Sequence, residues 1–296
     1  MEGYYWRIVD AARERVLVVL CGVCEGLSGR WALVALAAHP GGVVRYSIAA
    51  PAAGDGRRFG ATAADLLDGS LEHLRVRLDD SWVDAALHPN LRWPRRAFGA
   101  IGAAQMVPGL EQYWHPLMLD AGVSGEACVA GERWRLDGTR AYVEKNWGPG
   151  FAGRWWWGQA AAFPDPELGV AFAGGHVPLL GARPAPTAVV IHLGDRVLAF
   201  RPPLARGGFA AGPTSWRLRM SSPRYRLELD GDAGATAPHT LPVPELGAPR
   251  VKMRSRQVLA GQIALRLRQG RRTLIDARSP LAGLELGEPR PDAPQP

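Results

Sequence analysis

Residues 187–200 read TAVVIHLGDRVLAF, two β-branched and apolar runs that are separated only by Gly194 and Asp195. A Gly-Asp pair between two such runs is typical of the tight turn of a β-hairpin. Residues 187–193 and 196–200 are therefore predicted to be neighbouring antiparallel strands.

The same pattern of short runs and turns recurs along the chain. Two further hairpins are predicted, one between residues 216–220 and 225–229 and one between residues 262–268 and 273–276. The 36 Gly and 25 Pro residues are evenly spread, which favours many short strands over long helices. Only residues 61–74 have helical character. The sequence therefore predicts an all-β protein whose sheets are closed or sandwiched.

Length and composition exclude several classes of protein. A chain of 296 residues that is 47% hydrophobic and 21% charged is too apolar for intrinsic disorder, and three cysteines are too few for a disulfide scaffold. No apolar run approaches the roughly 20 residues that a bilayer requires. The opening MEGYYWR lacks the order of a signal peptide, so a cytoplasmic protein is predicted. The length fits two domains or one large domain.

The charge pattern leaves two interpretations open. The net charge is +7, and Arg250, Lys252, Arg254 and Arg256 alternate so that four cations lie on one face of a predicted strand. This face is either solvated or a docking surface for anionic lipid headgroups. No aromatic side chains are interleaved with these cations as stacking platforms, so nucleic acid is not a predicted partner.

Several familiar motifs do not carry their usual function here. GPGFAG at residues 148–153 matches G-x-G-x-x-G, but three tryptophans follow in place of a helix, which argues against dinucleotide binding. Cys21 and Cys24 of C-x-x-C would project from opposite faces of a strand, so they fit neither a disulfide nor a shared metal. The seven histidines form no metal-binding motif, and no G-x-S-x-G elbow occurs. Neither a metal site nor a serine hydrolase is predicted.

The most informative segment is residues 141–163, AYVEKNWGPGFAGRWWWGQAAAF. Strand alternation predicts three sets of side chains that each share a face: Tyr142, Glu144 and Asn146; Val143, Lys145 and Trp147; and Trp155, Trp157, Gln159 and Phe163. A row of polar groups near a row of tryptophans is either an inter-sheet polar network or the lining of a pocket with aromatic walls and one acid. Alternation alone does not decide between the two.

This segment resembles the central motif of the tocopherol cyclase family, Y-x-E-K-N-W-G followed by F-x-x-x-W-x-W-x-Q and F. In this chain the motif runs from Tyr142 to Phe163. Weaker matches are EGYYWR at residues 2–7, QYWH at 112–115, WRL at 216–218, LIDA at 274–277 and LELG at 284–287. The chain departs from plant-type members at Ala152, where they commonly have Pro, and it is shortened between Tyr5 and Trp114.

The resemblance implies a fold of two lipocalin-like antiparallel β-barrels packed together, as in carotenoid hydratase-like and Diels–Alderase-like relatives. On this basis residues 1–138 are predicted to form an N-terminal barrel and residues 139–287 a C-terminal barrel. A boundary after Phe163 is the alternative. The Pro-rich residues 288–296 are predicted to be a disordered tail.

The resemblance also implies a reaction, the closure of a chromanol ring from a prenylated hydroquinol. A proton adds to the alkene nearest the ring, and the phenol oxygen attacks the resulting tertiary cation. This isomerisation needs no redox cofactor and no metal. It needs a carboxylic acid that apolar surroundings keep protonated, aromatic faces near the cation, and hydrogen-bond partners for the phenol.

The motif supplies a candidate for each of these roles. Glu144 is the predicted acid, with Lys145 and Asn146 as further catalytic residues, and Trp155 and Trp157 are the predicted aromatic walls. An ion pair of Lys145 with a carboxylate of the other barrel is the structural alternative. The predicted substrate-binding residues are Tyr142, Trp147, Trp155, Trp157, Gln159, His115 and Tyr5, and the second choices for the acid are Asp120 and His115.

Two other functions fit the same scaffold. One is a non-catalytic, lipocalin-like carrier of isoprenoid lipids, and the other is a cyclase of another polyene in secondary metabolism. Fold alone does not separate these from a quinol cyclase. All three predict a hydrophobic small molecule as partner, and a substrate delivered from a bilayer adds peripheral contact with a membrane.

Overall fold

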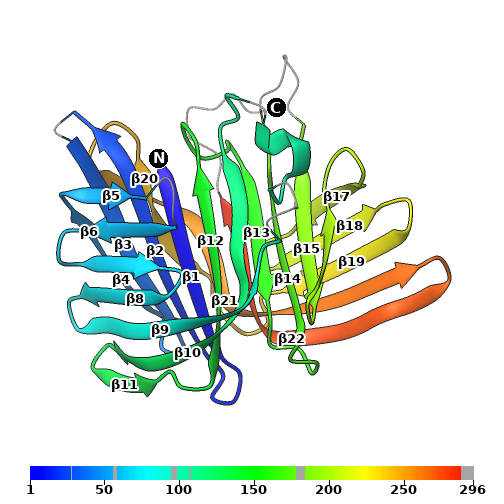
Figure 1. The fold of residues 1–296 in the computed structure, drawn as a ribbon, viewed down its shortest axis with the longest axis horizontal. Coiled ribbons are helices and arrows are strands. Elements are labelled where there is room, and N and C mark those ends of the chain that lie inside the picture. The colour runs from blue at the N-terminus through cyan, green and yellow to red at the C-terminus, as the bar shows by residue number, and fades with distance from the viewer. Residues whose placement is uncertain (28, 56–58, 95–98, 107, 178–183, 288–296) are drawn as a thin grey trace. The chain divides into compact units, whose positions relative to one another are not determined.

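The computed structural model describes residues 1–27, 29–55, 59–94, 99–106, 108–177 and 184–287 (Figure 1). Within these ranges nearly every element is a β-strand, and the one helix is the short 3₁₀ helix η1 (Gly102–Met106). No helix in this part of the chain is long and apolar enough to cross a bilayer. The all-β prediction is confirmed.

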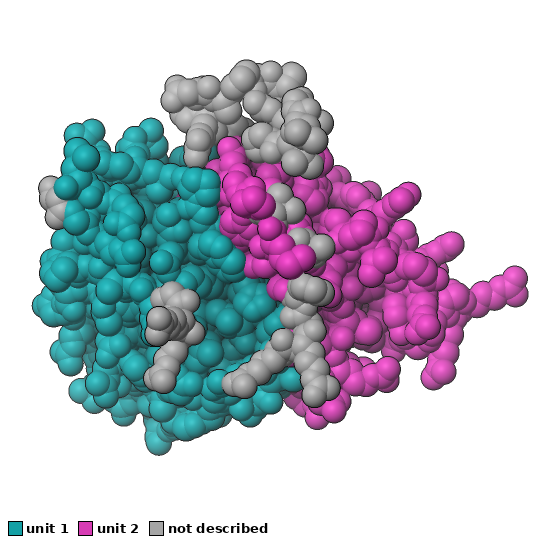
Figure 2. Space-filling model, turned by 45° about the horizontal axis from the view of Figure 1, so that its top comes forward, with its two compact units in different colours: residues 1–93, 115–150, 240–254 teal, residues 94–114, 151–239, 255–296 magenta. Residues whose placement is uncertain are grey.

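The chain divides into two compact units (Figure 2). The first comprises residues 1–93, 115–150 and 240–254, and the second comprises residues 94–114, 151–239 and 255–296. This division differs from the predicted one at residue 138, because residues 139–147 pair with the N-terminal strand of the first unit. The predicted tail, residues 288–296, lies outside the described residues.

The first unit is built on one antiparallel sheet in the order β4-β3-β2-β1-β12-β10-β9-β8-β7-β6-β5, with β11 paired to β10. Contacts between β3 and β5 bring the two ends of this sheet together, so that it forms a nearly closed barrel. Its strands are β1 (Glu2–Asp10), β2 (Arg15–Gly26), β3 (Gly29–His39), β4 (Val43–Ala49), β5 (Ala52–Gly54), β6 (Gly60–Ala63), β7 (Leu67–Ser70), β8 (His73–Leu78), β9 (Ser81–Arg92), β10 (Tyr113–Val129), β11 (Glu132–Arg135) and β12 (Thr139–Trp147).

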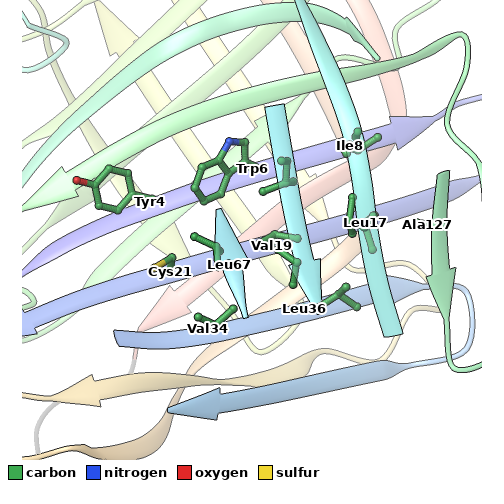
Figure 3. Close-up of a cluster of buried hydrophobic side chains, with 14 of the residues drawn as sticks. Tyr4, Trp6, Ile8, Leu17, Val19, Cys21, Val34, Leu36, Leu67 and Ala127 are labelled. Carbon is green, nitrogen blue, oxygen red and sulfur yellow. The ribbon is translucent and has the colours of Figure 1, made fainter. Parts of the chain in front are cut away.

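Strand alternation sorts the side chains of this barrel into two faces. Tyr4, Trp6 and Ile8 of β1 lie on the same side as alternate apolar residues of β2, among them Leu17 and Val19, and together they fill the barrel core (Figure 3). The intervening residues of β1, such as Tyr5 and Arg7, point to the opposite face. That face is also buried, and it carries the polar residues of the first unit's candidate site.

The second unit is built on a second antiparallel sheet, in the order β16-β15-β14-β13-β22-β21-β19-β18-β17. Contacts between β15 and β17 again bring the ends of the sheet together. Its strands are β13 (Trp155–Ala160), β14 (Leu168–Gly175), β15 (Thr187–Leu193), β16 (Arg196–Phe200), β17 (Arg206–Ala211), β18 (Ser215–Ser221), β19 (Tyr225–Asp232), β21 (Arg250–Gln269) and β22 (Arg272–Gly287), and β20 (His239–Glu245) pairs with β21. The core on one face of this sheet includes Trp156, Phe172 and Leu284.

The predicted hairpins are confirmed. Leu193 pairs with Arg196 across the turn in which Gly194 has φ +58°, a left-handed conformation that glycine adopts without strain. The pairs β18–β19 and β21–β22 correspond to the other two predicted hairpins. Cys21 and Cys24 also lie on opposite faces of β2, and both are free thiols.

Two local predictions are wrong. Residues 61–74 form β6, β7 and the start of β8 in place of a helix, because pairing within the sheet and packing against Trp6 override the helical character of this stretch. Phe163 does not share the face of Trp155 and Trp157. It follows the end of β13 and packs in the core of the second unit with Trp156.

Gly69 provides a test of how tightly the first core is packed. A Cβ at this position would lie 2.7 Å from Cζ2 of Trp6, which is fully buried. We expect Gly69→Ala to lower the free energy of unfolding by about 1–3 kcal/mol, measured by urea denaturation. The matched control is Gly122→Ala in β10, where a Cβ meets open space. Equal unfolding midpoints for the two variants would contradict this packing.

Candidate active site

The strand β12 carries the first part of the family-like motif. It pairs with β1 so that Tyr142 lies opposite Arg7, Glu144 opposite Tyr5 and Asn146 opposite Gly3. Val143 lies in the barrel core on the other face. The predicted alternation along this segment is confirmed, and the row that contains Glu144 lies on the face opposite the core.

Tyr142 and Glu144 form a buried pair on this face. The Tyr142 hydroxyl donates a hydrogen bond to Oε2 of Glu144 at 2.6 Å, and the two side chains are only 3% and 4% exposed. Arg7, on the same face, is completely buried, and this burial lowers its pKa to about 10. The sequence-predicted acid is therefore a buried carboxyl group with a phenol hydroxyl as its partner.

Asn146 and His115 each hold a buried polar atom without a hydrogen-bond partner in the described part of the chain, Oδ1 of Asn146 and Nδ1 of His115. The Asn146 amide lies over Gly3, where any side chain would overlap it. The His115 ring packs edge-on against Trp93 at 5.5 Å, and burial lowers its pKa to about 4. At neutral pH His115 is therefore uncharged, which suits contact with a substrate better than the role of a second-choice acid.

Lys145 lies on the opposite face of β12 from Glu144. Its Nζ donates to Oε2 of Glu2 at 2.7 Å and to the Tyr4 hydroxyl at 3.1 Å, and it lies 4.8 Å from the centre of the Tyr4 ring. The structure thus brings Lys145 together with Glu2 on the neighbouring strand of the same unit. Trp147 ends β12 opposite Glu2.

Asp120, the other second choice for the acid, is held in a structural ion pair. Its carboxylate lies 2.6 Å from Nη2 of Arg140 and accepts a hydrogen bond from the Asn90 amide at 2.9 Å. With a guanidinium and an amide both directed at it, this carboxylate serves the pairing of neighbouring strands.

The strand β13 carries the second part of the motif, in the second unit. Trp155, Trp157 and Gln159 share the face opposite Trp156, and all three are buried. Across the sheet Trp155 lies opposite Gly287 and Trp157 opposite Glu285. A glycine at 287 is required, because the Trp155 ring lies over its backbone.

Sequence reasoning missed Glu285. Its Oε1 accepts a hydrogen bond from the Trp155 indole N–H at 2.7 Å, and its Oε2 accepts one from the Gln257 amide at 3.3 Å. Burial raises the pKa of Glu285, and the bond from Trp155 only partly offsets this effect. The segment LELG at residues 284–287 could have indicated it. Because side chains alternate along a strand, Glu285 points to the face opposite the buried Leu284.

These residues form two clusters, one in each unit. Glu144, Tyr142 and Asn146 belong to the first unit, and Trp155, Trp157 and Glu285 belong to the second. Within the described residues no group of three or more His, Cys, Asp or Glu side chains could hold a metal ion. The chemistry that these clusters offer is proton transfer by carboxyl groups beside phenol and indole rings.

The architecture defines a protein of two lipocalin-like β-barrels. The chain is similar to the crystal structure of kievitone hydratase from Nectria haematococca, with a TM-score of 0.59 and 11% identity over 97% of this chain and 88% of that one. It is also similar to the structure of a protein assigned as AttH from Nitrosomonas europaea, with a TM-score of 0.52 and 14% identity over 98% of this chain and 92% of that one. At these identities the likeness shows the fold alone.

The sequence identifies the family. Residues 56–288 match the family described as tocopherol cyclase-like, and the chain belongs to this family. It is 27% identical over 192 residues to a rice protein (Oryza sativa subsp. japonica) described as a probable chloroplastic tocopherol cyclase, and 26% identical over 191 residues to the chloroplastic tocopherol cyclase of Zea mays. Each match covers 61% of this chain and 40% of the plant protein.

The Tyr142–Glu144 hydrogen bond has a measurable effect on stability. Tyr142→Phe keeps the ring and removes the hydroxyl donor, leaving a buried carboxyl oxygen with one partner fewer. We expect the free energy of unfolding to fall by about 1–3 kcal/mol, as measured by chemical denaturation. Tyr46→Phe, at a tyrosine that is 44% exposed, is the matched control and should change stability little. If both variants unfold alike, the pair does not stabilise this face.

Proposed function

We propose that this protein is an intramolecular cyclase that closes a chromanol ring from a prenylated hydroquinol. Membership of the tocopherol cyclase-like family supports this class of reaction. The observation that carries the proposal is the buried Tyr142–Glu144 pair within the family-like motif, because a proton-initiated cyclisation requires a carboxyl group shielded from water.

The reaction moves protons and leaves the composition of the substrate unchanged. A proton adds to the less substituted carbon of the trisubstituted alkene, and positive charge develops on the tertiary carbon. The phenol oxygen then forms a C–O bond to that carbon and loses its own proton. One proton is gained at carbon and one is lost at oxygen, so the product is an isomer of the substrate.

Each cluster contains groups suited to a part of this chemistry. In the first unit, Glu144 with Tyr142 beside it is a carboxyl group able to exchange a proton, and the unpaired Oδ1 atom of Asn146 is able to accept a hydrogen bond from a phenol. In the second unit, Trp155 and Trp157 offer π-faces to a cation, an attraction of about 2 kcal/mol or more in a dry site. The remaining proposed substrate contacts are Tyr5, His115, Trp147 and Gln159. Lys145, through its pairing with Glu2, positions β12.

The experiment is anaerobic incubation of the purified protein with a phytyl hydroquinol in D₂O, followed by chromatography and mass analysis. We expect a chromanol with one carbon-bound deuterium, because the proton that enters the alkene comes from an exchangeable group. Heat-denatured protein is the control. Quinol recovered bound but unconverted would instead support an isoprenoid carrier. Turnover only of a non-quinol polyene would support a different cyclase.

We further propose that the first unit contacts a membrane through two neighbouring turns. Leu27, at the turn between β2 and β3, is fully exposed, and a bridge between Gly26 and Gly247 brings this turn beside the half-exposed Leu246. The nearby cations of the predicted basic face are only partly free, since Lys252 pairs with Glu245 at 3.1 Å while Arg250 is exposed. Exposed leucines at a turn together with an arginine suit an interface with anionic lipid.

Co-sedimentation with phosphatidylcholine vesicles that contain roughly 30% phosphatidylglycerol tests this contact. The double variant Leu27→Ser/Leu246→Ser should bind at least about tenfold more weakly, because each buried leucine contributes about 1.5–3 kcal/mol. Leu204→Ser, at a leucine of the second unit that is 73% exposed, is the control and should bind as the unsubstituted protein does. Equal binding by all three proteins would refute the assignment of these turns.

A further inference from the structure

Glu285 is partly buried, and its carboxyl group has no cationic partner among the described residues. Within this part of the chain no Lys, Arg or His forms an ion pair with it, and its oxygens instead accept hydrogen bonds from Trp155 and Gln257. Burying a carboxyl group without a compensating cation is unfavourable for stability, and such groups are found preferentially at functional sites.

The surroundings of Glu285 favour its neutral form. Burial is the largest influence on its pKa and raises it above the ordinary value of 4.5, whereas the Trp155 N–H lowers it by a smaller amount. The positions that face it from the flanking strands β13 and β21 are Trp155, Trp157, Ser255 and Gln257, and none of these titrates. A carboxyl group in these surroundings can hold a proton and deliver it to a weak base.

The same face offers aromatic groups next to the acid. Trp157 is the direct cross-strand neighbour of Glu285, and the Trp155 ring lies over Gly287, one side-chain position further along β22 on the same face. Directly opposite residues in antiparallel strands have Cβ atoms about 4.5–5.5 Å apart. The acid and the two predicted cation-stabilising rings thus occur on one face of a single rigid sheet.

We propose that Glu285 is a catalytic residue, the donor of the proton to the alkene of the prenyl chain, with Trp155 and Trp157 stabilising the cation that forms. This inference rests on the proposed function. It changes the assignment made from sequence, in which Glu144 was the donor.

The proton and electron balance is simple. The O–H bond of Glu285 breaks as the alkene electron pair forms a C–H bond, and the phenol oxygen supplies the electron pair of the new C–O bond. The phenol proton is released to water, and the carboxylate of Glu285 takes up a proton from water, which restores the acid and keeps the product an isomer of the substrate.

The test compares Glu285→Gln with Asp276→Asn, which removes an exposed carboxylate from the same strand. Initial rates of chromanol formation from a phytyl hydroquinol and binding of the same quinol are both measured. We expect Glu285→Gln to lose at least about 100-fold in kcat, in line with the contribution of a general acid, and to bind the quinol within about threefold of wild type. Asp276→Asn should retain the wild-type rate.

The pH profile provides a readout that a purely structural role would not change. A donor must be protonated, so the wild-type rate should fall as the pH rises through the raised pKa of Glu285. Trp155→Phe removes the N–H that lowers this pKa, so the fall in rate should move to higher pH even if the rate itself is reduced. This measurement applies even if Glu285→Gln does not fold.

The outcomes separate the two proposals. If wild type converts the quinol and folded Glu285→Gln converts it at the same rate, Glu285 is not the donor and the proposed function stands. The donor role is also overturned if the pH at which the rate falls is the same in Trp155→Phe as in wild type. If folded wild-type protein binds the quinol but converts none of it, the proposed function itself fails.

Discussion

The pairing of β1 with β12 is the constraint on which the first unit depends. It joins residues 2–9 to residues 140–147, so the barrel forms only when two segments far apart in the sequence meet in one register. Because side chains alternate along a strand, a slip of one residue would turn Glu144 into the apolar core and Val143 out of it. The register therefore fixes both which residues form the core and which residues form the candidate site.

Sequence patterns a few residues long predicted the structural features that depend only on neighbouring residues. The hairpins, the all-β class, the faces of β2 and the alternation along β12 follow from runs of a few residues, and the structure confirms them. The helical prediction for residues 61–74 failed for a different reason. These residues are strands because of their sheet partners and because Gly69 lies under Trp6, and residues 140–147 likewise take their place from a distant partner, β1. Neither contact can be seen in a short window of sequence.

The candidate site shows the same limit. The motif placed Glu144 and the tryptophans on defined faces, but it said nothing about partners that arrive from distant strands. Lys145 meets Glu2, and Trp155 meets Glu285, which is 130 residues away. These partners influence the pKa values of the two carboxyl groups. Despite partial burial, hydrogen bonds from Lys145 and Tyr4 lower the pKa of Glu2, whereas the pKa of Glu285, which lacks a cation, is raised.

The cores explain why the proposed reactive groups lie outside the barrel interiors. In each unit the interior face of the sheet is occupied by a buried apolar cluster, which includes Trp6 and Met118 in the first and Phe172 and Leu218 in the second. A close-packed core holds the strands rigidly, so side chains on the opposite face of the same sheet are also held in fixed positions. The proposed carbocation chemistry needs such a fixed frame, because a proton donor and a π-face act only over short distances. The barrels therefore act as scaffolds, and the buried polar faces of β12, β13 and β22 carry the groups able to react.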